Sequence, residues 1–282
     1  MNSTPYQGGR VVAITGGARG IGRATGAAFL RAGARVALGD IDTALVEKTA
    51  AELGEATGGV VCGLPLDVTD RASFASFLDA AAERLGPLDA LVNNAGIMPT
   101  GNFTDETDDM TDRMVAINLC GVLNGSKLAA RRMTGRGGHI VNVASLAGVS
   151  AFPGLATYCA TKHAVVGFSE TLHLELAANG IGVTAVLPGV VHTELSAGHS
   201  APKWIRPIAE VEPEDVACAI VAAVGSHRTK VAVPRALGAI IKVAAGLPDR
   251  VRHRVSHAAH FDTAFTRVDP GARAAYHRRL QP

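Results

Sequence analysis

Aromatic residues are scarce in this chain of 282 residues, since Phe, Trp and Tyr make up 4% of it, with one tryptophan and three tyrosines. Cysteine is also rare, and Cys62, Cys120, Cys159 and Cys218 lie far apart without a CxxC pair. This spacing argues against a disulfide-rich secreted scaffold and against a zinc ribbon, because both need closely spaced cysteines. We therefore expect four reduced thiols, which fits a cytoplasmic protein.

Long hydrophobic runs are lacking too, although 48% of the residues are hydrophobic. No uninterrupted apolar stretch approaches the ~20 residues that a helix needs to cross a bilayer. The first ten residues, MNSTPYQGGR, lack the apolar centre of a secretory signal peptide. The ten histidines show no ligand spacing. We expect a cytoplasmic protein with no membrane span and no metal site.

Acidic residues become scarce in the last fifth of the chain. Residues 1–226 contain 16 Lys and Arg against 22 Asp and Glu, whereas residues 227–282 contain 11 against 3. We therefore expect one catalytic domain over residues 1–234 and a basic helical extension over residues 235–282. The extension is expected to pack on the core or on a neighbouring subunit, and the alternatives are an anionic membrane surface or an anionic substrate. Its basic residues match no nucleic-acid-binding module, so no nucleic-acid partner is expected.

Short apolar runs alternate with amphipathic stretches along residues 1–234. Seven runs rich in Val, Leu and Ile predict strands at residues 11–14, 35–39, 60–66, 89–93, 139–144, 183–188 and 230–234. Six amphipathic stretches predict helices at residues 20–32, 42–54, 70–85, 105–133, 157–179 and 213–225. Continuous apolar strands are typical of a parallel sheet with helices on both faces. The pattern indicates an α/β, Rossmann-type doubly wound fold.

A glycine-rich turn follows the first expected strand. Gly16, Gly20 and Gly22 lie in TGGARGIG, between a strand and a helix. Glycine permits a tight turn and lets a pyrophosphate approach the backbone at a helix N-terminus. The turn therefore predicts a dinucleotide site. Because its spacing differs from GxGxxG by two extra residues, a turn without a ligand is the alternative.

Two opposite charges near this turn bear on the choice of cofactor. Asp40 ends the second expected strand, where a carboxylate accepts hydrogen bonds from the adenosine ribose and repels a 2′-phosphate. Asp42 suits the N-cap of the following helix. Arg19, within the turn, favours the opposite choice, because a guanidinium can pair with a 2′-phosphate. We expect the carboxylate to decide the choice in favour of NAD, with NADP as the alternative.

Seven short motifs follow one another along residues 9–234: TGGARGIG (15–22), LDVTD (66–70), NNAG (93–96), INLCG (117–121), NVASLAG (142–148), YCATK (158–162) and PGVVHTE (188–194). Their order and spacing resemble the classical short-chain dehydrogenase/reductase family. The resemblance implies a seven-stranded parallel sheet and an oxidoreductase that interconverts a small-molecule secondary alcohol and a ketone. It also implies a homodimer or homotetramer, because residues 105–133 and 157–179 resemble the helices of the family's subunit interface.

The resemblance implies roles for the residues that match these motifs. The residues implied in catalysis are Asn118, Ser145, Tyr158 and Lys162. Those implied in cofactor binding are Gly16, Arg19, Gly20, Ile21, Gly22, Asp40, Asp67, Val68, Asn93, Ala95, Gly96, Tyr158, Lys162, Pro188, Gly189, Val191 and Thr193. Asp67 and Val68 would contact adenine, and Asn94 would brace the sheet. Thr193 would help to hold the nicotinamide carboxamide, with a helix N-cap as its alternative role.

Tyr158 and Lys162 lie four residues apart, so a helix projects both onto one face. In an arbitrary helix they would be a packed tyrosine and a solvated lysine. Beside a dinucleotide, an ammonium near a phenol, whose pKa is ordinarily about 10, favours the phenolate. Tyr158 could then exchange the substrate's hydroxyl proton while Ser145 holds its oxygen. Asn118 resembles the family residue that kinks its helix and holds a water leading to the lysine.

The substrate side of the site is expected to be apolar. The loops after the strands supply Leu146, Val149, Phe152, Leu195 and Trp204, which favours a lipophilic alcohol or ketone. Two alternatives stand beside the enzyme: a catalytically silent nucleotide-binding relative, and a membrane-peripheral protein that acts through its basic extension. The presence of all four residues implied in catalysis argues against the silent relative.

Overall fold

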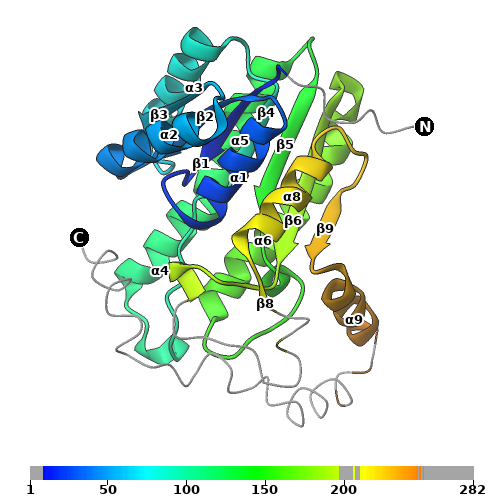
Figure 1. Ribbon diagram of the computed structural model, residues 1–282. Coiled ribbons are helices and arrows are strands. Elements are labelled where there is room, and N and C mark those ends of the chain that lie inside the picture. Colours follow the sequence, from blue (N-terminus) through cyan, green and yellow to red (C-terminus); the bar gives the residue numbers. More distant parts are fainter. Residues whose placement is uncertain (1–8, 197–205, 207–209, 247, 249, 251–282) are drawn as a thin grey trace.

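Seven parallel strands form the central sheet, in the order β3-β2-β1-β4-β5-β6-β9 (Figure 1). The computed structural model describes residues 9–196, 206, 210–246, 248 and 250. The strands are Val11–Thr15 (β1), Arg35–Asp40 (β2), Val61–Pro65 (β3), Ala90–Asn93 (β4), Gly138–Val143 (β5), Ile181–Pro188 (β6) and Lys230–Val233 (β9). The chain reverses its direction of travel across the sheet between β1 and β4, as in a doubly wound fold. The predicted seven-stranded parallel sheet is confirmed.

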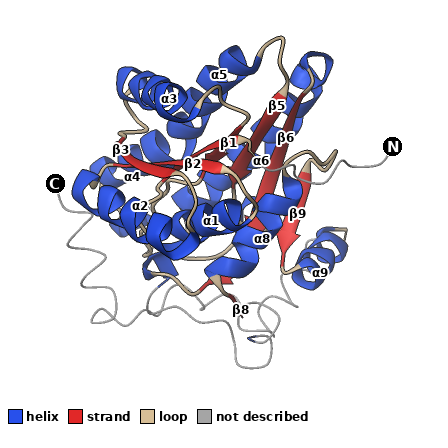
Figure 2. Ribbon diagram, turned by 45° about the horizontal axis from the view of Figure 1, so that its top comes forward, coloured by secondary structure: helices blue, strands red, loops and turns tan. Residues whose placement is uncertain are grey.

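Helices cover both faces of the sheet (Figure 2). One face carries α1 (Gly20–Arg31), α2 (Thr43–Thr57) and α8 (Pro213–Ala223). The other face carries α3 (Arg71–Leu85), α5 (Gly121–Met133) and α6 (Ala156–Leu176), with α4 (Asp108–Val115) beside α6. Phe29 and Leu38 are buried in the first layer, and Phe74 and Phe77 in the second. Since both faces are covered, the strands are continuously apolar.

The helix expected over residues 105–133 begins at Asp108 and is interrupted by a π turn, so its predicted start and its regularity were wrong. A 3-10 turn, Phe103–Asp105, precedes α4, whose N-cap is Thr107. One π-helical turn, Ala116–Cys120, then separates α4 from α5 and contains the buried Asn118. A π turn adds one residue to a helix, which barely disturbs an apolar stripe, so periodicity did not reveal it. Such turns are frequent at functional sites.

After β9 the chain forms α9 (Arg235–Ala245), which packs at the edge of the sheet. Leu237 and Ile241 join an apolar cluster with residues of α6 and β6, whereas Ile240 and Val243 are exposed. The rest of the extension expected over residues 235–282 lies outside the described residues, apart from 246, 248 and 250. Among the helices that the structure describes, none has the length and apolarity to span a bilayer.

A second, two-stranded sheet lies beyond β6. Parallel strands β7 (Val190–Val191) and β8 (Glu210–Val211) pair the two ends of the intervening segment. The imidazole of His192 reinforces this pairing, since its Nδ1 lies 2.6 Å from Glu212 Oε1 and its Nε2 lies 3.0 Å from Glu210 Oε2. The hydrogen bonds to Glu210 and Glu212 raise the pKa of His192. The imidazolium form, with two N–H donors, satisfies both carboxylates.

His139 lies at the start of β5 and is 3% exposed. Its Nδ1 accepts a hydrogen bond from the Gly225 N–H at 3.3 Å. Its Nε2, 2.9 Å from Thr184 Oγ1, therefore carries the proton and donates it to that hydroxyl. The Thr184 hydroxyl donates in turn to the Arg228 carbonyl. A second proton on His139 would face the Gly225 N–H, so these contacts favour the neutral imidazole.

Acid should weaken the fold through His139. Burial, followed by repulsion from His173, Arg10 and His227, lowers the pKa of His139 from 6.5 to about 4. Between pH 6.5 and pH 4, His139 is protonated in the unfolded chain but neutral in the folded one. The stability that depends on the neutral imidazole is therefore fully present above pH 6.5 and is lost as the pH falls toward 4. The interval corresponds to about 3 kcal/mol. The unfolding free energy, measured by urea titration across this range, should fall by this order, and His139→Gln should flatten the decline.

The exposed His163 provides a matched control, because it is not among the groups that lower the pKa of His139, so His163→Gln removes a histidine without altering those groups. This variant should keep the wild-type dependence of stability on pH. If His139→Gln loses stability between pH 6.5 and 4 as steeply as the wild type, His139 is not the titrating group.

Candidate active site

The residues expected in catalysis and cofactor binding gather where the central strands end. β1 ends at Thr15, β2 at Asp40, β4 at Asn93, β5 at Val143 and β6 at Pro188. Because the strands are parallel, these carboxyl ends lie along one edge of the sheet. Ligands of open α/β sheets bind at this edge, next to the point where the strand order reverses.

The glycine turn after β1 is sterically restricted to glycine at several positions. Gly16 and Gly20 have φ values of 65° and 52°, in the left-handed region that favours glycine. A Cβ on Gly22 would lie 2.0 Å from the Gly16 carbonyl oxygen. Arg19, the N-cap of α1, makes no side-chain cap hydrogen bond. The first amides of α1 thus receive no side-chain cap and suit an anionic group.

Asn94 fastens this turn to the end of β4. Its Nδ2 donates to the carbonyls of Thr15 at 2.9 Å and Gly16 at 3.1 Å. The Thr15 hydroxyl oxygen accepts from the main-chain amides of Asn94 and Ala95, at 2.9 Å and 3.0 Å. Asn94 is therefore structural, as expected, but it holds the glycine turn in addition to joining two strands.

Asn93 points its side chain into the protein. The residue is 3% exposed, and its Nδ2 donates to Asn142 Oδ1 at 2.8 Å and to Ser126 Oγ at 3.1 Å. Asn142 donates onward to Ser169 Oγ at 2.9 Å. The Asn93 side chain thus braces the sheet, and a cofactor at the strand end could meet this residue only through its main chain.

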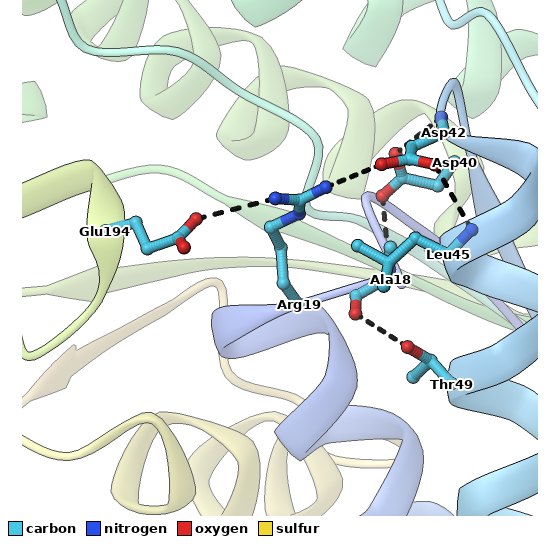
Figure 3. A network of polar contacts seen from close by, with 7 residues as sticks. All are labelled: Ala18, Arg19, Asp40, Asp42, Leu45, Thr49 and Glu194. Carbon is cyan, nitrogen blue, oxygen red and sulfur yellow. Dashed lines mark hydrogen bonds and ion pairs between the residues drawn. The ribbon is translucent and has the colours of Figure 1, made fainter. Parts of the chain in front are cut away.

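Asp40 anchors the glycine turn from the tip of β2 (Figure 3). Its Oδ2 accepts from the Ala18 amide at 3.1 Å, and its Oδ1 accepts from the Asp42 amide at 3.2 Å. The Ala18 carbonyl accepts from Thr49 Oγ1 at 2.8 Å, so Ala18 is held on both sides. The sequence predicted Asp40 as an acceptor for ribose hydroxyls. The contact with Ala18, which fixes the carboxylate beside the turn, was not predicted.

Arg19 extends from the same turn to two carboxylates (Figure 3). Its Nη2 lies 2.8 Å from Asp42 Oδ2, and its Nη1 lies 3.6 Å from Glu194 Oε2. Asp42 is also the N-cap of α2, as predicted, since its Oδ1 accepts from the Leu45 amide at 3.1 Å. Glu194 was not predicted as part of the site, because no sequence motif marks it as a neighbour of Arg19.

Tyr158 and Lys162 lie in the first two turns of α6 and are 6% and 4% exposed. Lys162 Nζ donates to the Val143 carbonyl at 2.9 Å and lies 5.6 Å from the centre of the Tyr158 ring. Burial lowers the pKa of Lys162 to about 8. The lysine is therefore mainly protonated at neutral pH, with its ammonium held close to the phenol.

Two other segments carry Ser145 and Asn118 to the side of α6. Ser145, two residues after Val143, caps the 3-10 turn Leu146–Gly148 by accepting from the Ala147 amide at 3.1 Å. Asn118 accepts from the Ile97 amide at 2.8 Å and donates to the Ile97 carbonyl at 2.9 Å. A Cβ on Gly96 would lie 3.2 Å from Asn118 Oδ1 and 3.7 Å from Lys162 Nζ. Because Gly96 has no side chain, its main chain lies close to both the Asn118 side-chain amide and the Lys162 ammonium.

The other residues expected to contact the cofactor lie around this edge. Asp67 Oδ1 accepts from the Thr69 amide at 2.8 Å, which shapes the loop after β3. Val68 is buried against Gly121, where a Cβ would approach Val68 Cγ2 to 2.9 Å. Thr193 lies opposite the glycine turn, since its Cγ2 would be 3.4 Å from a Cβ on Gly20.

The segment after β6 is shaped by main-chain hydrogen bonds. Pro188 is the last residue of β6, and the Gly189 amide donates to the Val233 carbonyl at 2.7 Å. Val191 follows in β7, and its carbonyl accepts from the Thr193 amide at 2.8 Å. These contacts turn the chain toward the glycine turn of β1. Ile21, in the first turn of α1, packs against the apolar cluster on the same face of the sheet.

An apolar cluster surrounds Tyr158. Its buried members are Met98, Met114, Ala147, Leu155, Tyr158 and Cys159, with Ile97, Met110, Phe152 and Leu195 packed against them. Leu146 and Val149, which were also expected to line the substrate side, instead belong to the cluster that includes Leu237 of α9. Trp204 lies outside the described residues. Burial raises the pKa of the Cys159 thiol, which does not favour a nucleophilic role.

Within the described residues, no group of three or more His, Cys, Asp or Glu side chains is arranged to hold a metal ion. The described site consists of a glycine turn, the buried pair Tyr158 and Lys162, and four charged residues beside the turn: Arg19, Asp40, Asp42 and Glu194.

Comparison with known proteins identifies the family. A family model for short chain dehydrogenase matches residues 10–204. Probable oxidoreductase EphD of Mycobacterium tuberculosis (strain ATCC 25618 / H37Rv) is 42% identical over 201 residues, which are 70% of this chain but 34% of EphD. The match thus spans about a third of that relative's length. Sorbitol dehydrogenase of Cereibacter sphaeroides is 43% identical over 188 residues, 66% of this chain and 72% of that enzyme.

A solved structure shares the fold. The short chain dehydrogenase/reductase of Burkholderia phymatum in complex with NAD superimposes with a TM-score of 0.76 at 27% identity, covering 85% of this chain and 93% of that one. A short-chain type dehydrogenase/reductase of Mycobacterium marinum gives a TM-score of 0.73 at 29% identity, covering 80% of this chain and 94% of that chain. The chain therefore belongs to the short-chain dehydrogenase family.

Proposed function

We propose that this protein is an NAD(H)-dependent oxidoreductase that interconverts a secondary alcohol and a ketone, with Tyr158 as the acid–base. One observation carries the proposal: Lys162 is 4% exposed, and its ammonium is held 5.6 Å from the centre of the Tyr158 ring at the edge of the sheet. Burying a charge is unfavourable unless it is compensated. A role in stabilising the phenolate explains why a lysine occupies this position.

The names of related proteins support this reaction class. Sorbitol dehydrogenase of Cereibacter sphaeroides and 2-(S)-hydroxypropyl-CoM dehydrogenase 3 of Xanthobacter autotrophicus are each 43% identical to this chain over their aligned segments. A third relative, from Sphingobium indicum, is a 2,5-dichloro-2,5-cyclohexadiene-1,4-diol dehydrogenase and is 38% identical over 190 residues. All three names describe dehydrogenation of a hydroxyl compound.

The edge of the sheet fits a nicotinamide dinucleotide. Gly22 has no room for a Cβ, and α1 begins without a side-chain cap, which suits a pyrophosphate. The Asp40 carboxylate is fixed beside the turn, where it can accept hydrogen bonds from ribose hydroxyls and would repel a 2′-phosphate. When bound, the nicotinamide would accept hydride from an alcohol or supply it to a ketone. NAD is favoured over NADP because β2 ends at a carboxylate, that of Asp40.

The proton is handled by residues of this chain. In alcohol oxidation Tyr158 takes the proton of the substrate hydroxyl, and in ketone reduction it returns a proton to the oxygen. Lys162 is protonated below its pKa of about 8, so its ammonium stabilises the phenolate electrostatically. The Ser145 hydroxyl donates a hydrogen bond to the substrate oxygen. Asn118 positions the main chain at Ile97, next to Gly96, where a Cβ would lie 3.7 Å from Lys162 Nζ.

The surroundings of Tyr158 favour a lipophilic substrate. Met98, Phe152, Leu155 and Leu195 pack in the cluster that contains the phenol. Sites for small molecules are mainly apolar, with few polar groups to orient the ligand. Turnover of secondary alcohols graded by size and polarity, with NAD as acceptor, would define the substrate class.

Tyr158→Phe should abolish turnover, because it removes the proton donor and acceptor while keeping the ring. Loss of a general acid–base lowers rates by about 10²- to 10⁴-fold. The affinity for NADH, measured by calorimetry, should change little. Cys159→Ala is a matched control on the same helix turn and should remain active. A Tyr158→Phe enzyme that keeps a tenth of wild-type turnover would contradict the acid–base assignment, and so would an inactive Cys159→Ala enzyme that binds NADH normally.

The protein is proposed to be a homodimer or homotetramer. Val115 of α4 and Leu174 of α6 are 37% and 76% exposed, which leaves apolar side chains on the helices expected at the interface. Light scattering at micromolar concentration should give a multiple of 28.9 kDa. Leu174→Glu should shift the mass toward the monomer, whereas Val60→Glu, at an exposed position before β3, should not. A monomeric wild type would refute the proposal.

A further inference from the structure

The guanidinium of Arg19 lies between two carboxylates beside the glycine turn (Figure 3). Asp42 follows β2 on one side at 2.8 Å, and Glu194 follows β7 on the other at 3.6 Å. The side chains of Arg19, Asp42 and Glu194 are 38%, 44% and 59% exposed. The guanidinium is therefore partly solvated, with an anion at each end of its planar group.

These contacts place Arg19 at the ribose end of the expected cofactor site. The Asp42 amide donates to Asp40 Oδ1 at 3.2 Å. Asp42 therefore contacts both Asp40, through its amide, and Arg19, through its carboxylate. Asp40 also accepts from Ala18, the residue before Arg19. Without its two partners, Arg19 would be suited to pair with a 2′-phosphate, because guanidinium and phosphate form strong bidentate contacts.

The charges in this group do not balance. Three carboxylates, those of Asp40, Asp42 and Glu194, accompany one guanidinium. The next described ion pairs on this face join Glu52 to Arg23 at 3.3 Å and to Lys48 at 4.0 Å, and they share no residue with this group. Among the described residues, a 2′-phosphate approaching Asp40 would thus meet more carboxylates than cations in this group, and Arg19 would already have two anionic partners.

We propose that Asp42 and Glu194 are specificity-determining residues for the cofactor, and that they act by occupying Arg19. This inference rests on the proposed function, in which the glycine turn binds a nicotinamide dinucleotide. Asp40 accepts hydrogen bonds from the ribose, whereas Asp42 and Glu194 keep Arg19 from binding the 2′-phosphate of NADP. Rejection of NADP therefore depends on the ion pairs of Arg19 with Asp42 and Glu194 as well as on the Asp40 carboxylate.

Action through Arg19 can be separated from direct repulsion. If Asp42 simply repels the phosphate, removing its charge helps NADPH equally with or without the guanidinium. If Asp42 acts by occupying Arg19, the gain requires Arg19. A double-mutant cycle of Asp42→Asn and Arg19→Gln distinguishes the two, because it measures the coupling between the residues.

The variants can be chosen to preserve the fold. Asp42→Asn removes the charge but keeps an oxygen for the Leu45 amide, and asparagine is as good an N-cap as aspartate. Asp42→Ser is a second choice for the same reason. Glu194→Gln conserves side-chain size. Glu52→Gln is a matched control, because it also removes one partly exposed carboxylate and breaks the ion pairs of Glu52 with Arg23 and Lys48, away from Asp40.

The readout is the dissociation constant of NADH and of NADPH, measured by calorimetry for the full chain. The wild type should bind NADH more tightly. Asp42→Asn and Glu194→Gln should each tighten NADPH binding about threefold, as expected for freeing a partly exposed ion-pair partner. NADH binding should change less than this. In the Arg19→Gln background the gain for NADPH should disappear, and Glu52→Gln should resemble the wild type.

In turnover, the KM for NADP should fall in Asp42→Asn while kcat with NADP stays the same. The inference is overturned if Asp42→Asn and Asp42→Ser leave NADPH affinity unchanged, if the gain persists in Arg19→Gln, or if the wild type prefers NADPH. A wild type that binds neither NADH nor NADPH would instead refute the proposed function, and the inference with it.

Discussion

The parallel register of the central strands is the constraint on which the rest of the site depends. Asn93 of β4 and Asn142 of β5 are register partners, so their amides meet at the same level of the sheet. Ser126 of α5 and Ser169 of α6 complete the buried network. A shift of either strand by one residue would send these side chains to opposite faces. The network thereby fixes both helices against the sheet, and α6 presents the reactive pair.

The position of Lys162 reflects two opposing demands. Burial disfavours its ammonium and lowers the pKa to about 8, while the Val143 carbonyl, at the end of β5, accepts one of its hydrogens. A lysine in water would be almost fully charged at neutral pH but would not be held against a phenol. A fully apolar environment would neutralise it. The strand end supplies a partner without a neutralising carboxylate, so the charge remains effective on Tyr158.

Much of the fold could be predicted because its determinants are local in sequence. Each strand is a continuous apolar run, and the glycine turn needs residues that tolerate a left-handed backbone or close contact. Tyr158 and Lys162 share a face through simple helical spacing. Periodicity alone could not predict the π turn at Asn118, because one additional residue leaves the apolar pattern almost intact, whereas the family resemblance implied a kink at this residue.

Contacts between distant segments were also beyond the sequence. Glu194 meets Arg19 only because the segment that follows β6 and β7 reaches the glycine turn, where Thr193 lies opposite Gly20. Asn93 turns inward only because Asn142 lies opposite. Leu146 and Val149 pack beneath α9 instead of beside Tyr158, since the 3-10 turn that follows Ser145 directs them there. Such placements depend on strand register and on the angle at which a loop leaves its strand, which residue types alone do not specify.

Cofactor choice illustrates why charges cannot be weighed one residue at a time. As separate residues, Asp40 favours NAD and Arg19 favours NADP. An ion pair of an exposed arginine contributes about 1 kcal/mol or less to binding. In the structure neither residue acts alone. The Asp40 carboxylate is oriented by the amides of Ala18 and Asp42, and the guanidinium already has anionic partners. Because these contacts form one connected group, the strength of each charge toward a phosphate is set by its neighbours.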